Sequence, residues 1–229
     1  MAKLTWHGHS TCTLVAEAGA TVVIDPFFDE NPACELGVAD ISPVDYILVT
    51  HGHFDHFVDC IPLAQSTGAT VIGTFEIAAF LQTQGIENVH GMNIGGGHHF
   101  DGVGYVKMTP ALHTGSVHGD ETGAYATLAA GFLIDMEGKG FHHAGDTALT
   151  RDMELLRGQV DVAVLPIGDN FTMGPADAAR AVDFISPKIV VPIHYNTWDI
   201  VAQDPELFRR EVGDKAQVQI LNPGESLEF

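Results

Sequence analysis

Short apolar runs recur along this chain, and each one leads to a polar residue that is able to do chemistry. Runs of four or five residues rich in Val and Ile are typical of buried β-strands. Because ligands of layered α/β proteins gather where strands end, the polar residues are expected to lie together at one edge. The runs are residues 21–24 before Asp25, 46–49 before Thr50 and His51, 141–144 before Gly145 and Asp146, 162–165 leading to Asp169, and 189–193 before His194.

Helical patterns separate these runs. The clearest has Ala178, Ala181, Val182 and Ile185 at positions i, i+3, i+4 and i+7, and Pro175 suits its first turn. Two further helical patterns are predicted, around Ile77, Phe80 and Leu81 with Gly85 at the end, and over residues 204–212.

Residues 103–136 follow a different, alternating pattern, which predicts strands with turns at 120–123 and 137–140. No Pro/Ser-rich linker or block of charge divides the chain, so we expect residues 1–229 to form a single α/β domain. Its mixture of hairpin and crossover connections predicts stacked sheets flanked by helices.

Residues 51–56, which read HGHFDH and are called the histidine turn below, place three imidazoles and one carboxylate directly after a predicted strand. Imidazole and carboxylate are the ligands that zinc, iron and manganese prefer. A tight turn allows alternate side chains to converge on one point while the others face a neighbouring point. Scattered histidines seldom cluster in this way without a metal, so the segment predicts a metal site more strongly than a polar surface loop.

Charge and composition exclude several classes of protein. The formal net charge is −20, and the ten Lys and Arg residues are spread thinly, so no basic stripe is present to bind a nucleic acid. The same acidity opposes an anionic membrane, and no apolar run approaches the length of a membrane span. The first residues lack the apolar region of a signal peptide, and the three cysteines lack C-x-x-C spacing. We therefore expect a cytoplasmic protein without a nucleic-acid or membrane partner, and a homo-oligomer is compatible with the sequence.

The sequence resembles the metallo-β-lactamase superfamily, whose first signature is H-x-H-x-D-H after a strand. Later signatures follow in order: His113 in residues 110–113 (PALH), Asp146 in 143–147 (HAGDT) and His194 in 192–196 (PIHYN). Within the superfamily, the chain looks like a small family of largely uncharacterised metal-dependent hydrolases related to the ascorbate-phosphate lactonase. That likeness rests on residues 6–10 (WHGHS), 24–27 (IDPF), 166–174 (PIGDNFTMG) and 194–197 (HYNT).

The resemblance implies a four-layer αββα sandwich that holds two divalent metal ions. Zinc is the first choice, and manganese, iron and nickel are also compatible with the ligands. A hydroxide shared by the two metals would attack the substrate, with Asp55, Asp146 and His9 taking part in catalysis. By the same resemblance, His51, His53 and His113 hold the first metal, Asp55, His56 and His194 hold the second, and Asp146 bridges them.

Other polar residues are candidates for supporting roles. His9 is expected in or beside the pocket and not on a metal, whereas His7 is as well explained as an ordinary packing histidine. Asp25 resembles a carboxylate that orients a ligating imidazole, although an Asp before Pro26 is also a common turn residue. At most one of His142 and His143 should face the site, because neighbours in a strand point to opposite sides. Candidates for substrate contact are His118, Asp169, Asn170, Asn196 and Trp198.

The substrate is expected to be a small ester, lactone or phosphoester. Few Lys or Arg residues lie near the motifs, which weakens phosphate recognition and ranks an ester or lactone first. The alternative is a non-catalytic metal-binding or regulatory protein that retains the fold. All seven predicted ligands are intact, which favours the enzyme.

Overall fold

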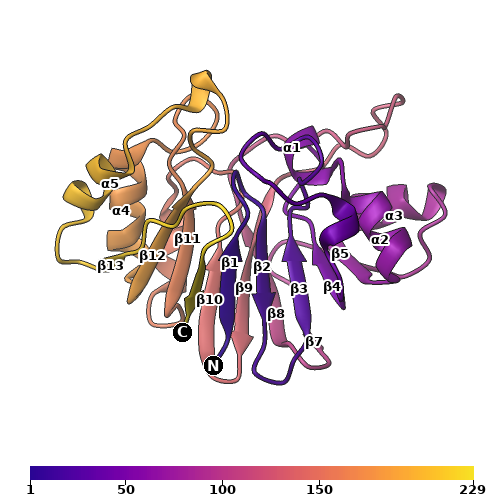
Figure 1. Ribbon diagram of the computed structural model, residues 1–229, viewed down its shortest axis with the longest axis horizontal. Coiled ribbons are helices and arrows are strands. Elements are labelled where there is room, and N and C mark those ends of the chain that lie inside the picture. The colour runs from indigo at the N-terminus through magenta and orange to yellow at the C-terminus, as the bar shows by residue number, and fades with distance from the viewer.

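Two seven-stranded sheets pack face to face, with helices on their outer faces, in the computed structural model, which describes residues 1–229 (Figure 1). The first sheet has the order β14-β1-β2-β3-β4-β5-β6. Its strands are β1 (Lys3–Trp6), β2 (Cys12–Val15), β3 (Thr21–Ile24), β4 (Tyr46–Leu48), β5 (Thr70–Thr74), β6 (Val89–Met92) and β14 (Ser226–Glu228).

The second sheet has the order β13-β12-β11-β10-β9-β8-β7. The first half of the chain therefore forms the first sheet and the second half forms the second sheet, except that the last strand, β14, joins the first sheet. Its strands are β7 (Gly97–Phe100), β8 (Gly104–Pro110), β9 (Ala130–Met136), β10 (Lys139–His143), β11 (Val162–Pro166), β12 (Ile189–Ile193) and β13 (Gln217–Val218).

Both sheets combine an antiparallel half with a parallel half. Neighbours from β14 to β3 are antiparallel and those from β3 to β6 are parallel. In the second sheet, strands β7 to β10 are antiparallel and β10 to β13 are parallel. The carboxyl ends of β1, β3 and β4 therefore lie at one edge of the first sheet, and those of β8, β10, β11 and β12 at one edge of the second. These edges meet at the top of Figure 1, beside α1 (Phe54–Phe57).

The helices form two separate groups, at opposite sides of the sandwich in Figure 1. Helices α2 and α3 enclose a smaller apolar cluster against the first sheet, whereas the larger cluster fills the space between the sheets and extends beneath α4 and α5. The helical segments are α1 (Phe54–Phe57), α2 (Cys60–Thr67), α3 (Phe75–Thr83), α4 (Pro175–Ile185), α5 (Pro205–Val212), η1 (Val38–Asp40), η2 (Arg151–Leu156) and η3 (Asp199–Val201). The fold is the αββα sandwich that the sequence predicted.

Helix α4 illustrates how the local pattern sets the packing. Pro175 lies in its first turn, where a missing N–H costs no hydrogen bond, and the residues at the predicted apolar positions are buried. The helix ends where Ser186 adopts a left-handed conformation, with φ 57°. The predictions of α3 and α5 are likewise confirmed in place and extent.

The prediction of alternating strands throughout residues 103–136 was wrong for its middle part. Only β8 and β9 form there, and residues 111–129 are a long loop without strands. The predicted turn at 120–123 lies inside that loop, where the Asp120 carboxylate accepts hydrogen bonds from the backbone N–H groups of Thr122 and Tyr125. Side chains that bond to their own backbone in this way compete with strand pairing. The turn at 137–140 does join β9 to β10.

None of the helices has the length and apolarity required to cross a membrane.

Candidate metal centre

The histidine turn leaves the end of β4 and enters α1, so its side chains sit at the edge where the strands end. His53 is the N-cap of α1, with extended backbone, and the four residues of that helix follow it. Gly52 allows the long loop to approach, since a Cβ there would lie 2.6 Å from Cα of Val117 and 2.8 Å from the Ser116 carbonyl oxygen. The histidine turn is therefore in close contact with the loop that also carries His113, and this contact requires glycine at position 52.

Three imidazoles converge to form what we call the first group: His51, His53 and His113. Nε2 of His51 lies 3.0 Å from Nδ1 of His53, and Nε2 of His113 lies 3.3 Å from the same atom. Nitrogens that share one tetrahedral zinc ion lie about 3.3 Å apart, because each Zn–N bond is about 2.0–2.1 Å long. The first group thus has the spacing of three ligands around one ion.

A second group contains Asp55, His56 and His194, and His9 lies within the same cluster. Oδ2 of Asp55 lies 3.7 Å from Nε2 of His56 and 3.9 Å from Nε2 of His194. The turn provides Asp55 and His56, while His194 directly follows β12 of the other sheet. The second group is consequently assembled from both sheets, as the first group is.

Asp146 lies between the two groups, just after β10. Its Oδ2 is 3.1 Å from Nε2 of His194, 3.4 Å from Nε2 of His56 and 3.7 Å from Nε2 of His113. One carboxylate oxygen is therefore close to imidazoles of both groups. This is the position that a ligand shared by two metal ions requires.

The donor atoms of this centre fit divalent cations. Nε2 of His56, Oδ1 of Asp146 and both ring nitrogens of His194 are buried and have no hydrogen-bond partner. Buried polar atoms are nearly always paired, and several unpaired ones in one cluster are costly without a ligand. Imidazole nitrogens with carboxylate oxygens form a donor set suited to zinc, manganese, iron or nickel.

A buried network orients two of the imidazoles. Oδ2 of Asp25 lies 2.8 Å from Nδ1 of His56 and accepts a 2.7 Å hydrogen bond from the Thr50 hydroxyl. Because that hydroxyl donates to Asp25, its oxygen can accept from Nδ1 of His51 at 3.0 Å. Both rings then keep a proton on Nδ1 and turn Nε2 towards the centre as the atom that can bind a metal, which is how carboxylates usually orient metal-ligating histidines.

His9 is fully buried and holds Asp55. Its Nε2 lies 2.8 Å from Oδ2 of Asp55, and its Nδ1 lies 2.8 Å from the Thr197 hydroxyl. An ionised carboxylate only accepts, so Nε2 donates to Asp55 and Nδ1 accepts from Thr197. Burial lowers the pKa of His9 to about 4, so the ring is neutral at neutral pH.

The metal-free centre keeps its carboxylates ionised. Burial raises the pKa of Asp146, but the His194 and His56 imidazoles outweigh it and hold that pKa well below its usual range. Burial also lowers the pKa of His56, yet Asp146 and Asp55 raise it well above the usual value. For His51 burial prevails and its pKa falls well below the usual value. Negative charge therefore persists in the centre and favours cation binding.

Several residues at this edge adopt left-handed backbone conformations that are uncommon outside glycine. His9, Asp25 and His194 have φ values of 51°, 50° and 56°. Such conformations cost free energy and tend to cluster at functional sites, where surrounding contacts impose them. Here each of the three residues carries a side chain into the centre or its supporting network.

The candidates for substrate contact divide into two kinds. Trp198 lies against the centre, with its ring centroid 4.9 Å from that of His9, and the His118 ring lies 5.3 Å from that of Phe54. Asp169 and Asn196 are instead engaged inside their own loops, where they accept hydrogen bonds from backbone N–H groups. Asn170 is exposed beside Asp169.

The other histidines lie outside the centre. His7 packs on Phe28, and its Nε2 lies 2.8 Å from the Thr13 hydroxyl. His143 faces the opposite sheet, with Nε2 3.0 Å from the Ser10 carbonyl oxygen, while His142 lies on the outer face of its sheet. The two neighbours thus point to opposite sides, as a strand requires.

Sequence reasoning missed four residues that support this site. Thr50 and Thr197 bind His51 and His9, and Phe27 and Phe54 pack beside Trp198 and His118. A threonine directly before the histidine turn was the available signal for Thr50. The aromatic residues gave none, because an apolar side chain in a loop is indistinguishable from a core residue until the fold is known.

The fold and this cluster of ligands define a metallo-hydrolase of the metallo-β-lactamase type, and comparisons with known proteins agree. The profile of the β-lactamase superfamily domain matches residues 20–195. A UPF0173 metal-dependent hydrolase of Staphylococcus aureus strain JH9 is 49% identical over 232 residues, which cover 99% of this chain and 100% of the relative. The chain therefore belongs to the UPF0173 family of metal-dependent hydrolases, within the metallo-β-lactamase superfamily.

Solved structures give the same result. Igni18, a metallo hydrolase from Ignicoccus hospitalis, has a TM-score of 0.88 and 33% identity, covering 100% of this chain and 99% of that one. The isothiocyanate hydrolase from Delia radicum gut bacteria has a TM-score of 0.76 and 22% identity, covering 99% and 98% of the two chains. At that identity the second likeness shows the fold alone.

Proposed function

We propose that this metal-dependent hydrolase uses two divalent metal ions, zinc in the first instance, to hydrolyse a small uncharged ester or lactone. The first group, His51, His53 and His113, would hold one ion. The second group, Asp55, His56 and His194, would hold the other, and Asp146 would be shared.

One observation carries the two-metal proposal. A single carboxylate oxygen, Oδ2 of Asp146, is 3.1–3.7 Å from imidazole nitrogens of both groups. An ion held by the first group alone would leave Nε2 of His56 and Nε2 of His194 buried without a partner. When bound, two divalent cations would supply an activated water near neutral pH and positive charge for a developing oxyanion.

The protein groups around the ligands have positioning roles. Asp25 fixes His56 directly and His51 through Thr50, so the two imidazoles stay in one tautomer and one orientation. His9 donates to Asp55 and is shielded from solvent, which supports a role in holding that ligand and not in contacting substrate.

The charge of the surrounding loops favours an uncharged substrate. A phosphoester or carboxylate is normally bound by Arg or Lys side chains as well as by metals. None of the loops at this edge contains a Lys or Arg, so an anionic substrate would depend on the metals and backbone amides alone. These loops are residues 7–11, 25–45, 49–59, 111–129, 144–150, 167–174 and 194–204.

Aromatic side chains beside the second group favour an apolar substituent on the substrate. Phe27 packs between Trp198 and Phe54, with ring centroids 6.0 Å and 5.5 Å away, and Phe54 in turn contacts His118. Trp198 is 38% exposed, so one part of this wall is accessible from solvent. An aryl or short acyl group would bury apolar area against it.

The test compares substrates of different charge on protein that has been stripped of metal and reloaded with Zn²⁺. The substrates are a p-nitrophenyl acyl ester, an unsubstituted lactone and bis(p-nitrophenyl) phosphate, and kcat/KM is measured for each. We expect the neutral substrates to exceed the phosphodiester by about 100-fold or more, with activity lost on metal removal. A phosphodiester preference would overturn the substrate class.

Metal stoichiometry tests the other half of the proposal. Two ions per chain should bind to the reloaded protein, as measured by inductively coupled plasma mass spectrometry after gel filtration. A saturating content of one ion per chain with full activity would overturn the two-metal mechanism and leave the substrate class intact.

A further inference from the structure

The outer face of the second sheet contains a cavity that is separate from the metal centre. It has a volume of about 170 Å³ and is floored by β8, β9 and β10. Pairing places Lys107, Leu133 and His142 in one row across these strands, and Thr109 pairs with Gly131 in the next row. The η2 segment forms one wall through Met153, Leu155 and Leu156.

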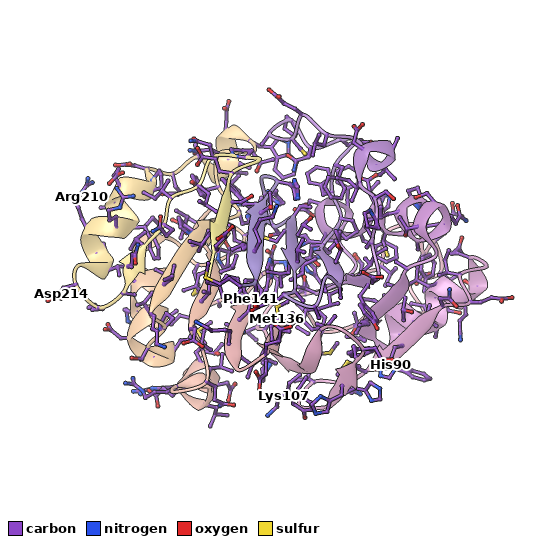
Figure 2. The ribbon with its side chains drawn as sticks, turned by 60° about the horizontal axis from the view of Figure 1, so that its bottom comes forward. His90, Lys107, Met136, Phe141, Arg210 and Asp214 are labelled. Atoms are coloured by element: carbon purple, nitrogen blue, oxygen red, sulfur yellow. The ribbon has the colours of Figure 1, made fainter.

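Figure 2 helps to locate this face. Lys107 lies at the lower margin of that view, whereas Met136 and Phe141, which are buried between the sheets, lie towards the middle. The cavity therefore opens on the side of the sheet away from the other sheet. A broader groove of about 500 Å³ continues from it along the same face and shares Lys107, Leu133 and Gln159.

Two buried side chains that line this cavity each have a polar atom without a hydrogen-bond partner. Thr109 is 3% exposed, and its hydroxyl oxygen makes no hydrogen bond. His142 is 2% exposed, and only its Nδ1 is engaged, 3.1 Å from the Phe132 carbonyl oxygen. Because a carbonyl oxygen only accepts, Nδ1 carries the proton. Burial lowers the pKa of His142 to about 4, so Nε2 is left as an unprotonated acceptor.

Only the His142 acceptor faces the cavity. The Thr109 hydroxyl oxygen is shielded from solvent, and it lies 2.7 Å from where a Cβ on Gly131 would be, beside the carbonyl oxygens of His143 and Ala144. The Thr109 hydroxyl is therefore enclosed by backbone, whereas Nε2 of His142 is unengaged and borders a space whose remaining lining is largely apolar.

We propose that this cavity is a second ligand site, which takes a small neutral molecule with one hydroxyl or N–H donor on an apolar body the size of a benzene ring. The donor binds Nε2 of His142. A cavity of about 150 Å³ is large enough for benzene, so the volume fits one ring. Lys107 and Asp152 at the mouth carry opposite charges, which gives no preference for an ion.

Phenol and anisole provide a matched pair of probes, since the methyl ether retains the ring and oxygen but lacks the donor. Binding is followed in the metal-loaded protein by NMR of the leucine methyl groups. Leu133 and Leu156 report on the cavity, and Leu112, next to His113, reports on the metal centre. We expect phenol to shift the Leu133 and Leu156 signals with an affinity at least about tenfold higher than that of anisole.

Two variants test the polar contact. His142→Leu removes the acceptor and should weaken phenol binding several-fold while leaving the binding of anisole nearly unchanged. Thr109→Val is the control, because it removes an enclosed, unpaired hydroxyl beside the same cavity and should leave the binding of both probes unchanged.

Three outcomes would overturn the proposal. Phenol could fail to bind up to its solubility limit, or bind no better than anisole in all variants, or shift only the Leu112 signals. None of these results would alter the proposed hydrolase mechanism, because the cavity shares no ligand with the metal centre.

Discussion

The two sheets contribute to the metal centre in different ways. The first sheet supplies four predicted ligands from one six-residue turn, whereas the second supplies three from three separate loops, which follow β8, β10 and β12. The turn is a local structure that β4, α1 and Gly52 hold together. The predicted ligands of the second sheet, His113, Asp146 and His194, meet only because the strands before them are in register.

This difference assigns separate tasks to the two sheets. The turn determines which of its donor atoms face each of the two groups of predicted ligands, and the network through Asp25 and Thr50 keeps them oriented. The second sheet closes each group with one imidazole and adds the shared carboxylate. Substitutions in the turn and in the second sheet should therefore have different effects on metal content and activity.

The largest expected effect is that of Asp146→Asn. The amide keeps the size of the side chain but loses the charge that both groups share, so kcat/KM should fall about a thousandfold or more. Metal content should drop below two ions per chain, as measured by mass spectrometry. A variant with two ions and full activity would contradict the bridging role.

His113→Ala and His194→Ala each remove one imidazole from one group only. Each should lower kcat/KM by about 100-fold or more and reduce saturation to about one ion per chain, with the other group still filled. His98→Ala is the control, since His98 packs on His90 and Phe100 away from the centre. If either variant had the activity and metal content of this control, the substituted histidine would not be a ligand of the group to which it is assigned.

The contrast between the sheets also explains what could be predicted from the sequence. The spacing within residues 51–56 indicates a metal site by itself, because local geometry brings these side chains together. No spacing rule connects His113, Asp146 and His194, since their meeting depends on strand order and register. They were identified only through the resemblance to the superfamily.

The elements show the same division. Strands with Val and Ile runs, such as β3 and β12, and helix α4 with its apolar face agree with their predictions. Strand β7, with the sequence GHHF, was not predicted, because its Gly and His residues give no period and pairing with β8 forms it. Residues 111–129 were predicted to form strands because they belong to an alternating pattern. Such alternation does not show whether a neighbouring strand is available for pairing.

Asp25→Asn should have a smaller effect than the loss of a ligand. The amide oxygen can still accept from the Thr50 hydroxyl and His56 in place of Oδ2, but the amide nitrogen cannot accept the 2.7 Å hydrogen bond that the Thr50 backbone N–H donates to Oδ1. Replacing such supporting groups usually costs about 10–100-fold in metal affinity or activity. Competition with a chromophoric zinc chelator would measure this loss. An affinity equal to that of the unaltered protein would show that the turn alone orients its histidines.

Gly52→Ala tests whether the turn and the loop of the second sheet form one unit. The φ angle at Gly52 is compatible with alanine, so the added methyl group acts only by contact, against the backbone of residues 116 and 117. Moving that backbone should cost about 1–3 kcal/mol of stability. It should also displace His113, because this residue lies in the same loop and completes the first group.

The matched control for Gly52→Ala is Gly96→Ala, whose nearest contact beyond its chain neighbours would be 3.1 Å, in the turn between β6 and β7. Thermal unfolding of the metal-free proteins should show the larger loss for Gly52→Ala. Zinc titration should show weakening of one of the two ions only, because the second group contains no residue of the displaced loop. Equal weakening of both ions would mean that the sheets do not act separately, since a shift at their contact would then disturb the whole centre.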